Sequence, residues 1–473
     1  MYIISSDMEV PDIDYLRNRV EDMMVAGIKT RDLKGMYESF KKAQMQSLHT
    51  LSTLYGINNP NSPKQILDYY NTKLGNEISE SIRDSGTNAD RADLMKVVYK
   101  LVSEEIKEVT EETISDLKLG DDLDRESFID CLNRLVNNSI INSMYRDGKW
   151  TTDKVAMASM ALQGRQDAKD ILTYRKAKKF TESVKSFIDA THSDGLVHPA
   201  VSMGKTNRIN YSSPALMNIP KQLLWNMLGP KEDGNMLVSV DIKQQEPWIM
   251  INLLGIERLQ NMLLNRRELG LYEQVFLDIF DRLPETIERS EVKQAWNALT
   301  YGASKFGIKR ICRNIDGDKV YQYFNKFKEF SSYRARAKKM AAKGVQLAHT
   351  LFGTELYADE LNKNKLSRIL MDLPIQGTGT DVLALLVQHF DEFSEENGLE
   401  GLIEIYYTRH DEVILEINKG YVQEVGKEYV FELLRNTFEH KIDDWEPFQV
   451  EIKELKVDDN FVLELKDEDL EVE

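Results

Sequence analysis

Cysteine is scarce in this sequence of 473 residues, which contains only Cys131 and Cys312. Two thiols are too few for a disulfide framework or a four-thiolate zinc site, so any metal must be bound by carboxylates. The sequence has no run of 18 apolar residues, and its first residues lack the basic start and the long apolar stretch of a signal peptide. These absences predict a cytoplasmic protein with no membrane partner.

Positive charge is also in short supply, with 61 Lys and Arg against 78 Asp and Glu and a net charge of −17. The acidic excess is concentrated in two segments. Residues 77–147 contain 17 acidic and 9 basic residues (net −8), and residues 454–473 contain 9 and 2 (net −7), which leaves −2 elsewhere. Two basic clusters, at 175–179 and 326–343, lie outside these two acidic segments. Such clusters are usually solvated helix faces, and a phosphate-binding role requires an active site nearby.

The pattern of apolar residues changes along the chain, whose length predicts two or three lobes. Residues 12–190 are mostly of helical pattern, with Ser62 as a helix N-cap and Pro63 as the first helical residue. An apolar run from 236 to 241 predicts a strand, and residues 403–408 and 413–417 predict a hairpin. Helices are expected between these strands, at 271–280, 289–301, 320–343 and 377–395.

Acidic residues follow the predicted strands. Asp241 ends the first strand, and Asp411 and Glu412 lie at the tip of the hairpin. Each alone is typical of a helix cap or a solvated turn. If the hairpin packs beside the first strand, Asp241 and Asp411 converge without a basic neighbour, and Mg²⁺, which prefers oxygen ligands, relieves their repulsion. Two such ions could clamp the attacking and leaving oxygens of a phosphoryl transfer.

A second pattern lies in the helix predicted at 289–301. Arg289, Lys293, Asn297 and Tyr301 recur every four residues and so form one row on its surface. An Arg and a Lys one turn apart are usually surface charges, but they would equally suit a triphosphate that lies along the helix. The spacing alone leaves both interpretations open.

Three motifs in this order resemble the family A DNA polymerases, of the bacterial DNA polymerase I type. Residues 238–246 (VSVDIKQQE) are similar to the first catalytic motif of that family, residues 289–302 to its nucleotide-binding helix, and residues 410–412 (HDE) to its second catalytic motif. Residues 25–28, 168–179, 206–220 and 373–381 resemble flanking segments, so the resemblance runs from about residue 14 to about 450.

The resemblance implies an α+β fold in the form of a right hand, with a helical thumb, an antiparallel-sheet palm and helical fingers. The implied parts are an N-terminal lead (1–13), a thumb region (14–190) with an acidic insertion (77–147), the first part of the palm (191–260), fingers (261–345), the second part of the palm (346–453) and an acidic tail (454–473). We expect the insertion to face away from DNA and to serve as a partner surface.

The resemblance also implies a role for each matching residue. Asp241, Asp411 and the carbonyl of Ile242 would bind two Mg²⁺ ions, supported by Glu412, and Lys293 would assist catalysis. Glu246 would fill the space of a ribose 2′-hydroxyl and so favour deoxynucleoside triphosphates. The other implied nucleotide-binding residues are Arg289, Tyr301, His410, Gln244 and Asn297. The implied contacts with primer–template DNA are Arg208, Asn218, Gln376, Arg368, Lys178 and Lys179.

The chain departs from the family pattern at four positions, which the resemblance places near the nucleotide sugar or the duplex edge. Asn297 stands where an aromatic residue is usual, Trp248 replaces Arg, Asp372 replaces Asn and Met217 replaces Gln. Only about a dozen residues precede the thumb, so we expect no 3′ to 5′ exonuclease domain and no proofreading. A phage or mobile element that encodes a separate exonuclease or processivity protein would suit such a polymerase.

Two alternatives remain at this point. A single-subunit phage-type RNA polymerase has the same palm and the same Arg, Lys and Tyr-Gly helix, but Glu246 and the short N-terminus speak against it. A non-catalytic nucleic-acid scaffold would be under no chemical constraint to keep the acids and Lys293. The sequence therefore favours DNA synthesis.

Overall fold

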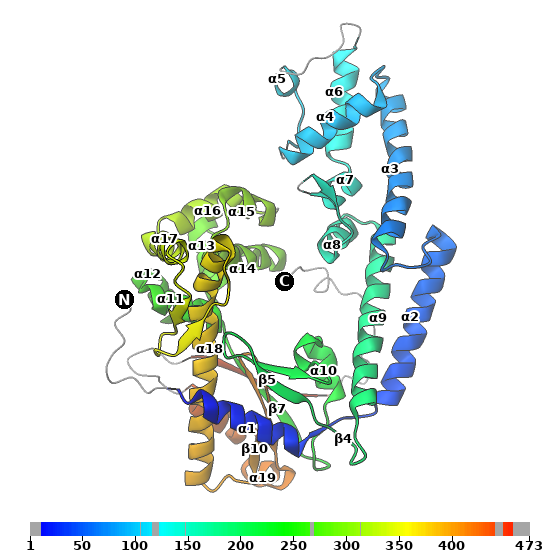
Figure 1. Cartoon of the computed structure of the whole chain (residues 1–473). Coiled ribbons are helices and arrows are strands. Elements are labelled where there is room, and N and C mark those ends of the chain that lie inside the picture. Colours follow the sequence, from blue (N-terminus) through cyan, green and yellow to red (C-terminus); the bar gives the residue numbers. More distant parts are fainter. Residues whose placement is uncertain are drawn as a thin grey trace. The chain divides into compact units, whose positions relative to one another are not determined.

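The computed structural model describes residues 11–456, except 105, 116–122, 147, 265–268, 313 and 440–447. The described residues divide into two compact units, one made of residues 11–33 and 186–456 and the other of residues 34–185 (Figure 1). The expected acidic tail lies outside the described residues from 457 onward, as do residues 1–10 of the expected lead. The boundaries of thumb, palm and fingers stay predictions.

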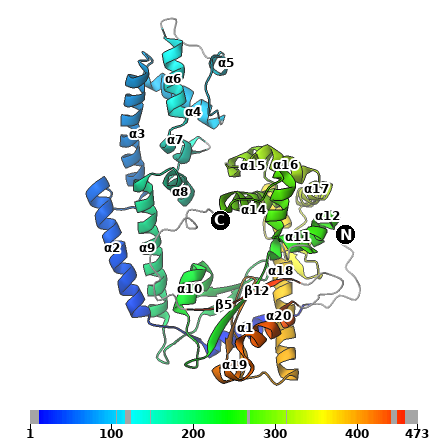
Figure 2. The ribbon, with the colours of Figure 1, turned by 180° about the vertical axis from the view of Figure 1, so that it is seen from behind.

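The first unit is built on a four-stranded antiparallel sheet in the order β10-β11-β7-β12, of which β12 is labelled in Figure 2. Its strands are β7 (Met236–Ile242), β10 (Ile403–Arg409), β11 (Glu412–Ile417) and β12 (Val450–Glu454). Every residue of β11 is buried, because this strand is central and both of its faces are covered. The predicted strand and hairpin are confirmed. The hairpin turn is tighter than predicted, since only His410 and Asp411 lie between the strands, and Glu412 is a buried strand residue and not a solvated turn residue.

The long helix α18 (Lys363–Glu396) is the core helix of this unit. Among the described residues it alone is long and apolar enough to cross a membrane, but 83% of its apolar stretch is buried inside the fold. The helix predicted at 377–395 begins earlier, at Lys363, and continues through Pro374, although proline lacks an N–H and normally ends a helix. Beside it, the Tyr333 hydroxyl donates a hydrogen bond to the carbonyl of Met371 (2.6 Å).

The N-terminal helix α1 (Ile13–Ala26) packs on α18, and a partly buried polar cluster joins the two helices. The Arg19 guanidinium donates two hydrogen bonds to the Asp391 carboxylate (2.9 and 3.1 Å), and the Tyr15 hydroxyl donates a third (2.7 Å). A bidentate Arg–carboxylate pair fixes orientation as well as distance. The residues of α1 are therefore part of the sheet unit.

Seven helices lie within residues 245–342 in the described part of the chain. They are α11 (Gln245–Leu254), α12 (Glu257–Leu264), α13 (Leu271–Phe280), α14 (Thr286–Thr300), α15 (Lys305–Ile311), α16 (Gly317–Asn325) and α17 (Lys328–Ala342). Among them, α14 contacts four of the others, α13, α15, α16 and α17. The single helix predicted at 320–343 is wrong, because Phe327 is extended and separates α16 from α17. The break lets Phe324 and Phe330 both pack edge-on against the buried Trp296 ring, at centroid distances of 5.3 and 6.0 Å.

The remaining elements of the first unit are short pairs of strands and peripheral helices. They are β1 (Ile28–Lys29), β4 (Leu196–Val197), β5 (Ala200–Met203), β6 (Ile209–Ser212), η1 (Leu216–Asn218), α10 (Lys221–Met227), β8 (Leu347–His349), β9 (Glu355–Tyr357), α19 (Lys419–Val425) and α20 (Lys427–Phe438).

The second unit is almost entirely helical. Its elements are α2 (Leu33–Tyr55), α3 (Pro63–Ser85), α4 (Arg91–Ser103), α5 (Glu111–Ile114), α6 (Arg125–Val136), α7 (Ser139–Met144), β2 (Tyr145–Arg146), β3 (Lys149–Trp150), α8 (Lys154–Leu162) and α9 (Gln166–Ala190), whose last residues belong to the first unit. The predicted helix start is confirmed, since the Ser62 side chain accepts a hydrogen bond from Gln65 N (3.4 Å) and Pro63 is the first helical residue.

The acidic segment 77–147 contributes to the core of this second unit. Leu132 and Ile140, from the segment, are fully buried in one hydrophobic cluster with Met157 and Ile171, which lie beyond it. The helices of this segment are therefore part of the hydrophobic core of the second unit.

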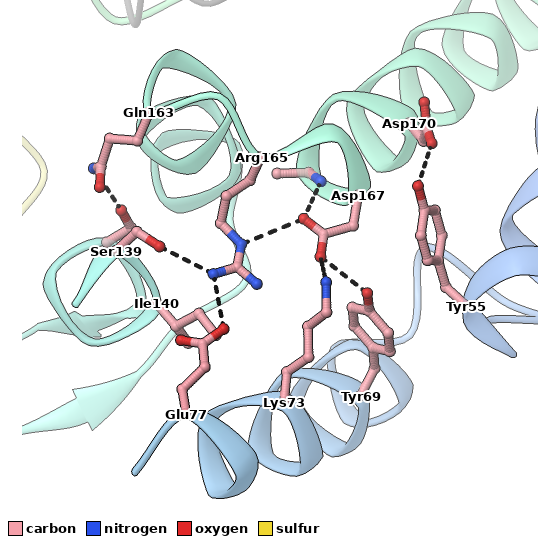
Figure 3. Close-up of polar contacts among 12 residues, drawn as sticks. Tyr55, Tyr69, Lys73, Glu77, Ser139, Ile140, Gln163, Arg165, Asp167 and Asp170 are labelled. Atoms are coloured by element: carbon pink, nitrogen blue, oxygen red, sulfur yellow. Dashed lines mark hydrogen bonds and ion pairs between the residues drawn. The ribbon is translucent and has the colours of Figure 1, made fainter. Parts of the chain in front are cut away.

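A buried polar network joins α3 to the start of α9 (Figure 3). The Asp167 carboxylate, 3% exposed, accepts hydrogen bonds from Lys73 (2.7 Å) and Tyr69 (2.9 Å). Arg165 bonds Asp167 through Nε (3.5 Å) and reaches Glu77 with Nη1 (3.3 Å). Buried charges need such partners. The network holds the acidic segment to α9 at a fixed place.

Candidate active site

Two neighbouring strands bring three acidic side chains together at one edge of the sheet. Glu412, the first residue of β11, lies directly opposite Asp241 of β7, and Asp411 precedes it in the turn. The Ile242 amide donates a hydrogen bond to the Asp411 carbonyl (3.0 Å), so the register extends to the turn. The structure thus brings together the acids that the sequence predicts to converge.

Burial and mutual repulsion act on the ionisation of these acids. Burial, followed by the Asp241 charge, raises the pKa of Asp411 to about 6. Burial also raises the pKa of Glu412, although the Lys221 charge and a hydrogen bond from the Ser239 hydroxyl oppose the shift. Carboxylates with this behaviour are stabilised in their charged form by a nearby cation.

The expectation that the acids lack a basic neighbour is wrong. The Lys221 ammonium forms an ion pair with Asp241 and lies 3.2 Å from Glu412 Oε1. Lys221 is the first residue of α10 and lies 20 positions before Asp241, so strand patterns could not reveal it. The available signal was its place directly after Pro220, the last residue of the segment 206–220 that the resemblance sets before the palm strand.

The contacts of Lys221 provide a test of whether the site suits a metal ion. A cation already lies between the oxygens of Asp241 and Glu412, and hard divalent ions prefer such ligands. No three His, Cys, Asp or Glu side chains in the described part of the chain are arranged as a complete metal site. The acids therefore fit Mg²⁺ if other oxygens, from nucleotide or water, complete the coordination.

The row predicted on α14 is present. Trp296 is buried in the aromatic cluster, whereas Lys293 is exposed and Asn297 is partly exposed, so the row and the tryptophan occupy different faces. Arg289 forms an ion pair with Glu273 of α13, and its guanidinium lies over the Tyr272 ring, 5.6 Å from the centroid. Lys293 is thus available at the surface, and Arg289 is held by the single carboxylate of Glu273.

A polar network surrounds Glu246, in the first turn of α11. Its Oε1 accepts hydrogen bonds from Arg208 (3.2 Å) and from Gln376 of α18 (2.6 Å). Tyr301, directly after α14, hydrogen-bonds Gln376 and Asp372, and burial raises the pKa of both Tyr301 and Asp372. Two donors from separate segments, Arg208 and Gln376, therefore fix the position of the Glu246 carboxylate.

The other predicted site residues lie in varied environments. His410 has a positive φ of 53° in the hairpin turn, and desolvation followed by the Arg208 and Arg409 charges lowers its pKa. Gln244 also has a positive φ, 54°, directly before α11. The structure leaves Asn218 and Arg368 exposed, and Ile242 is buried in β7.

Two predicted DNA contacts lie on α9 in the second unit. Lys179 is exposed, and Lys178 pairs with Glu182 (3.3 Å). Their place in the second unit leaves their role as DNA contacts a prediction.

The four departures from the family pattern have different surroundings. Trp248 is 1% exposed and packs on the Phe448 ring at 3.9 Å, so the expectation that it touches the duplex edge is wrong. The Trp248 ring, on α11, is therefore part of the hydrophobic core. Met217 lies against Tyr407, whose hydroxyl is 4.0 Å from the sulfur, and Asp372 bonds Tyr301. Asn297 alone faces outward in the row with Lys293.

Comparison with known proteins identifies the family. The model of the family described as DNA polymerase family A matches residues 93–454, more than half of the chain. The chain belongs to this family. A DNA polymerase I from Caldicellulosiruptor bescii is 29% identical over 306 residues, which are 60% of this chain and 35% of that protein. A thermostable DNA polymerase I from Thermus thermophilus is 24% identical over 375 residues, 72% of this chain and 42% of that protein.

A solved structure agrees with the fold. The polymerase domain of Pol1 from M. smegmatis, in complex with a DNA primer–template and dNTP, superposes with a TM-score of 0.63 at 19% identity, covering 95% of this chain and 70% of that one. The predicted fold class, a mixed helix and sheet fold of the right-hand polymerase type, is confirmed. This chain spans only about a third to two fifths of the length of the two DNA polymerase I relatives.

Proposed function

We propose that this chain extends a DNA primer in the 5′ to 3′ direction on a DNA template, using deoxynucleoside triphosphates and two divalent metal ions, without 3′ to 5′ proofreading. The observation that carries the proposal is the convergence of Asp241, Asp411 and Glu412 on one sheet edge, where a cation already contacts two of them. Family membership supports the same reaction class.

In this proposal Asp241 and Asp411 hold the ions, with the Ile242 carbonyl assisting. Bound Mg²⁺ would activate the primer hydroxyl and neutralise charge that develops on the phosphates. Glu412, buried and bonded to Ser239, would keep the acidic edge in register and supply negative charge.

The exposed row of α14 would receive the triphosphate. Arg289 would offer a planar fork to the outer phosphates, and His410, in the hairpin turn between β10 and β11, would be a second donor. Lys293 is exposed and placed one turn further along, where it would neutralise the α-phosphate and protonate the leaving pyrophosphate. Each of these residues would thus stabilise negative charge that develops on the phosphates during phosphoryl transfer.

Sugar selection would depend on Glu246. Its carboxylate is held by Arg208 and Gln376, and a held side chain excludes a 2′-hydroxyl more strictly than a mobile one. Tyr301 would close against the templating pair. Gln244 and Asn297 would line the remaining edge of the nucleotide site, and Arg208, Asn218, Gln376, Arg368, Lys178 and Lys179 would contact the duplex.

A primer-extension assay tests the proposal. A labelled primer on a longer DNA template is incubated with Mg²⁺ and either deoxynucleotides or ribonucleotides, and a mismatched primer is incubated without nucleotides. The expected result is extension by deoxynucleotides only and no shortening of the mismatched primer. Promoter-driven synthesis without a primer would favour the phage-type RNA polymerase, and DNA binding without synthesis would favour the scaffold.

The proposal includes a partner. Segment 77–147 carries a net charge of −8, and placing it against phosphates would be repulsive. We therefore propose that this segment binds a separate protein, such as a processivity factor or an exonuclease. The phage-like origin and the cytoplasmic location stay predictions.

A further inference from the structure

Lys221 occupies a place at the acidic edge that no catalytic role yet explains. Its ammonium bridges Asp241, from β7, and Glu412, from β11, which are opposite each other in the sheet register. The Glu412 side chain is 4% exposed and the Asp241 side chain is 29% exposed, so Lys221 links a buried carboxylate to a partly exposed one. A positive charge thus lies where two strands would otherwise present only negative ones.

Lys221 can also move its side chain away from the two carboxylates. Its side chain is 38% exposed, and its four-carbon stem is flexible. The ammonium lies 4.9 Å from the centre of the Trp225 ring, one helical turn further along α10, which offers a second favourable contact for a cation. Lys221 can therefore swing from the carboxylates toward the ring and solvent without breaking the helix.

We infer that Lys221 is a resident counter-ion, which holds Asp241 and Glu412 together in the metal-free enzyme and competes with a divalent ion for the Asp241 carboxylate. This inference rests on the proposed function, because it takes Asp241 as a metal ligand. An ammonium and a divalent ion that share one carboxylate at hydrogen-bond distance repel each other strongly in a partly buried site. One of them must therefore withdraw.

The competition has a thermodynamic consequence. If binding of the ion requires Lys221 to release Asp241, removal of Lys221 removes that cost and tightens metal binding. A coupling of ordinary size predicts a dissociation constant lower by about tenfold. If Lys221 served only to position Asp241 for the ion, removal of Lys221 would instead weaken metal binding.

Mn²⁺ binding to the whole chain, without DNA or nucleotide, tests the inference. Free Mn²⁺ is measured by electron paramagnetic resonance for the wild type, Lys221→Met, Lys221→Arg and Asp241→Asn. Lys243→Met is the matched control, since Lys243 is exposed and lies two residues after Asp241. We expect Lys221→Met to bind Mn²⁺ about tenfold more tightly, while Lys221→Arg and Lys243→Met stay near the wild type.

Three outcomes would overturn the inference. Unchanged or weaker binding by Lys221→Met would remove the competition, and equal tightening by Lys243→Met would reduce it to a general charge effect. If Asp241→Asn leaves Mn²⁺ binding unchanged, the metal assignment of the proposed function fails as well, so the two failures are distinguishable. Should Lys221→Met not fold, as judged by circular dichroism, Lys221→Gln carries the same expectation.

Thermal unfolding adds an independent measurement. With a chelator present, Lys221→Met should melt at a lower temperature than the wild type, because two neighbouring carboxylates lose their counter-ion. Saturating Mn²⁺ should then raise the melting temperature of Lys221→Met by more than that of the wild type. An equal rise in both proteins would contradict the inference.

Discussion

The side-chain amide of Gln376 donates a hydrogen bond of 2.6 Å to the Glu246 carboxylate, although 130 positions separate the two residues. Arg208 bonds the same carboxylate oxygen from a third segment. A side chain that two donors hold has little freedom to move aside. The residue proposed to exclude ribonucleotides is therefore positioned by residues that the sequence analysis assigned to the DNA duplex.

This relationship predicts the effect of two substitutions on sugar selection. Glu246→Ala opens the volume of the 2′-hydroxyl, so ribonucleotide incorporation should rise and deoxynucleotide use should slow. Gln376→Ala leaves the carboxylate in place but less restrained, and should relax selection by about three- to tenfold, which corresponds to the net contribution of one ordinary hydrogen bond, about 1 kcal/mol. Single-nucleotide incorporation with each nucleotide type measures both effects.

The control for Gln376 lies on the same helix. The side-chain amide of Gln388 donates a hydrogen bond of 2.9 Å to the surface residue Glu392. Gln388→Ala should leave the ratio of deoxynucleotide to ribonucleotide incorporation unchanged. Unchanged selection in Glu246→Ala would show that another group excludes the 2′-hydroxyl.

Removal of either proposed metal ligand should abolish synthesis. Asp241→Ala and Asp411→Ala should each reduce primer extension below about one per cent of the wild type, because each removes a metal-binding oxygen. Duplex binding, measured by fluorescence anisotropy, should persist, since neither side chain is a phosphate contact. Glu400→Ala, at an exposed acid, is the control. Residual synthesis above that level in both variants contradicts the two-metal assignment.

Asp381, buried in α18, should make stability depend on pH. Burial raises its pKa from 3.8 to about 6, and hydrogen bonds from Thr350 and Thr354 offset only part of the shift. The folded state therefore binds this proton more tightly than the unfolded state does. Its stability should fall as pH rises from about 4 to about 6 and stay lower above, by at most about 3 kcal/mol.

Asp381→Asn removes that titration and keeps an acceptor for the Thr354 hydroxyl, which donates to Asp381 Oδ1 at 3.0 Å. The free energy of unfolding of Asp381→Asn relative to the wild type should increase between pH 4 and pH 7, as measured in urea. Asp359→Asn, at a side chain that is 96% exposed, should show no such change. A pH-independent difference for Asp381→Asn would refute the expectation.

The parts of the fold that sequence analysis predicted correctly are those set by local patterns. The apolar runs gave β7 and the hairpin, and Ser62 before Pro63 gave the start of α3. The motifs also predicted that Asp241 and Asp411 converge, because the strand ends of neighbouring antiparallel strands meet.

The errors arose where tertiary contacts override local rules. Pro374 lies inside α18, where the Tyr333 hydroxyl donates a hydrogen bond to the nearby Met371 carbonyl. The break at Phe327 lets Phe324 and Phe330 pack onto Trp296. Lys221 was missed because only the folded sheet brings it to Asp241.

The last prediction concerns Asn297, which shares the exposed row of α14 with Lys293. The family resemblance implies an aromatic ring here that packs on the nucleotide sugar, and a Tyr hydroxyl can substitute for a missing 3′-hydroxyl. Asn has neither the ring nor the reach. The native chain should therefore use dideoxynucleotides poorly, and Asn297→Tyr should improve their use by about tenfold, equivalent to roughly 1.4 kcal/mol.

The neighbouring Trp296 provides the test of register. A residue on a helix is turned by about 100° from the next, so Trp296 and Asn297 cannot both face the sugar. The Trp296 ring is 2% exposed and packs against Phe324 and Phe330, so Trp296→Ala should lower stability by about 3–5 kcal/mol. We expect it to leave the ratio of dideoxynucleotide to deoxynucleotide incorporation unchanged at a temperature where the variant is folded. If only the Trp296 change alters that ratio, the assignment of Asn297 to the sugar is wrong.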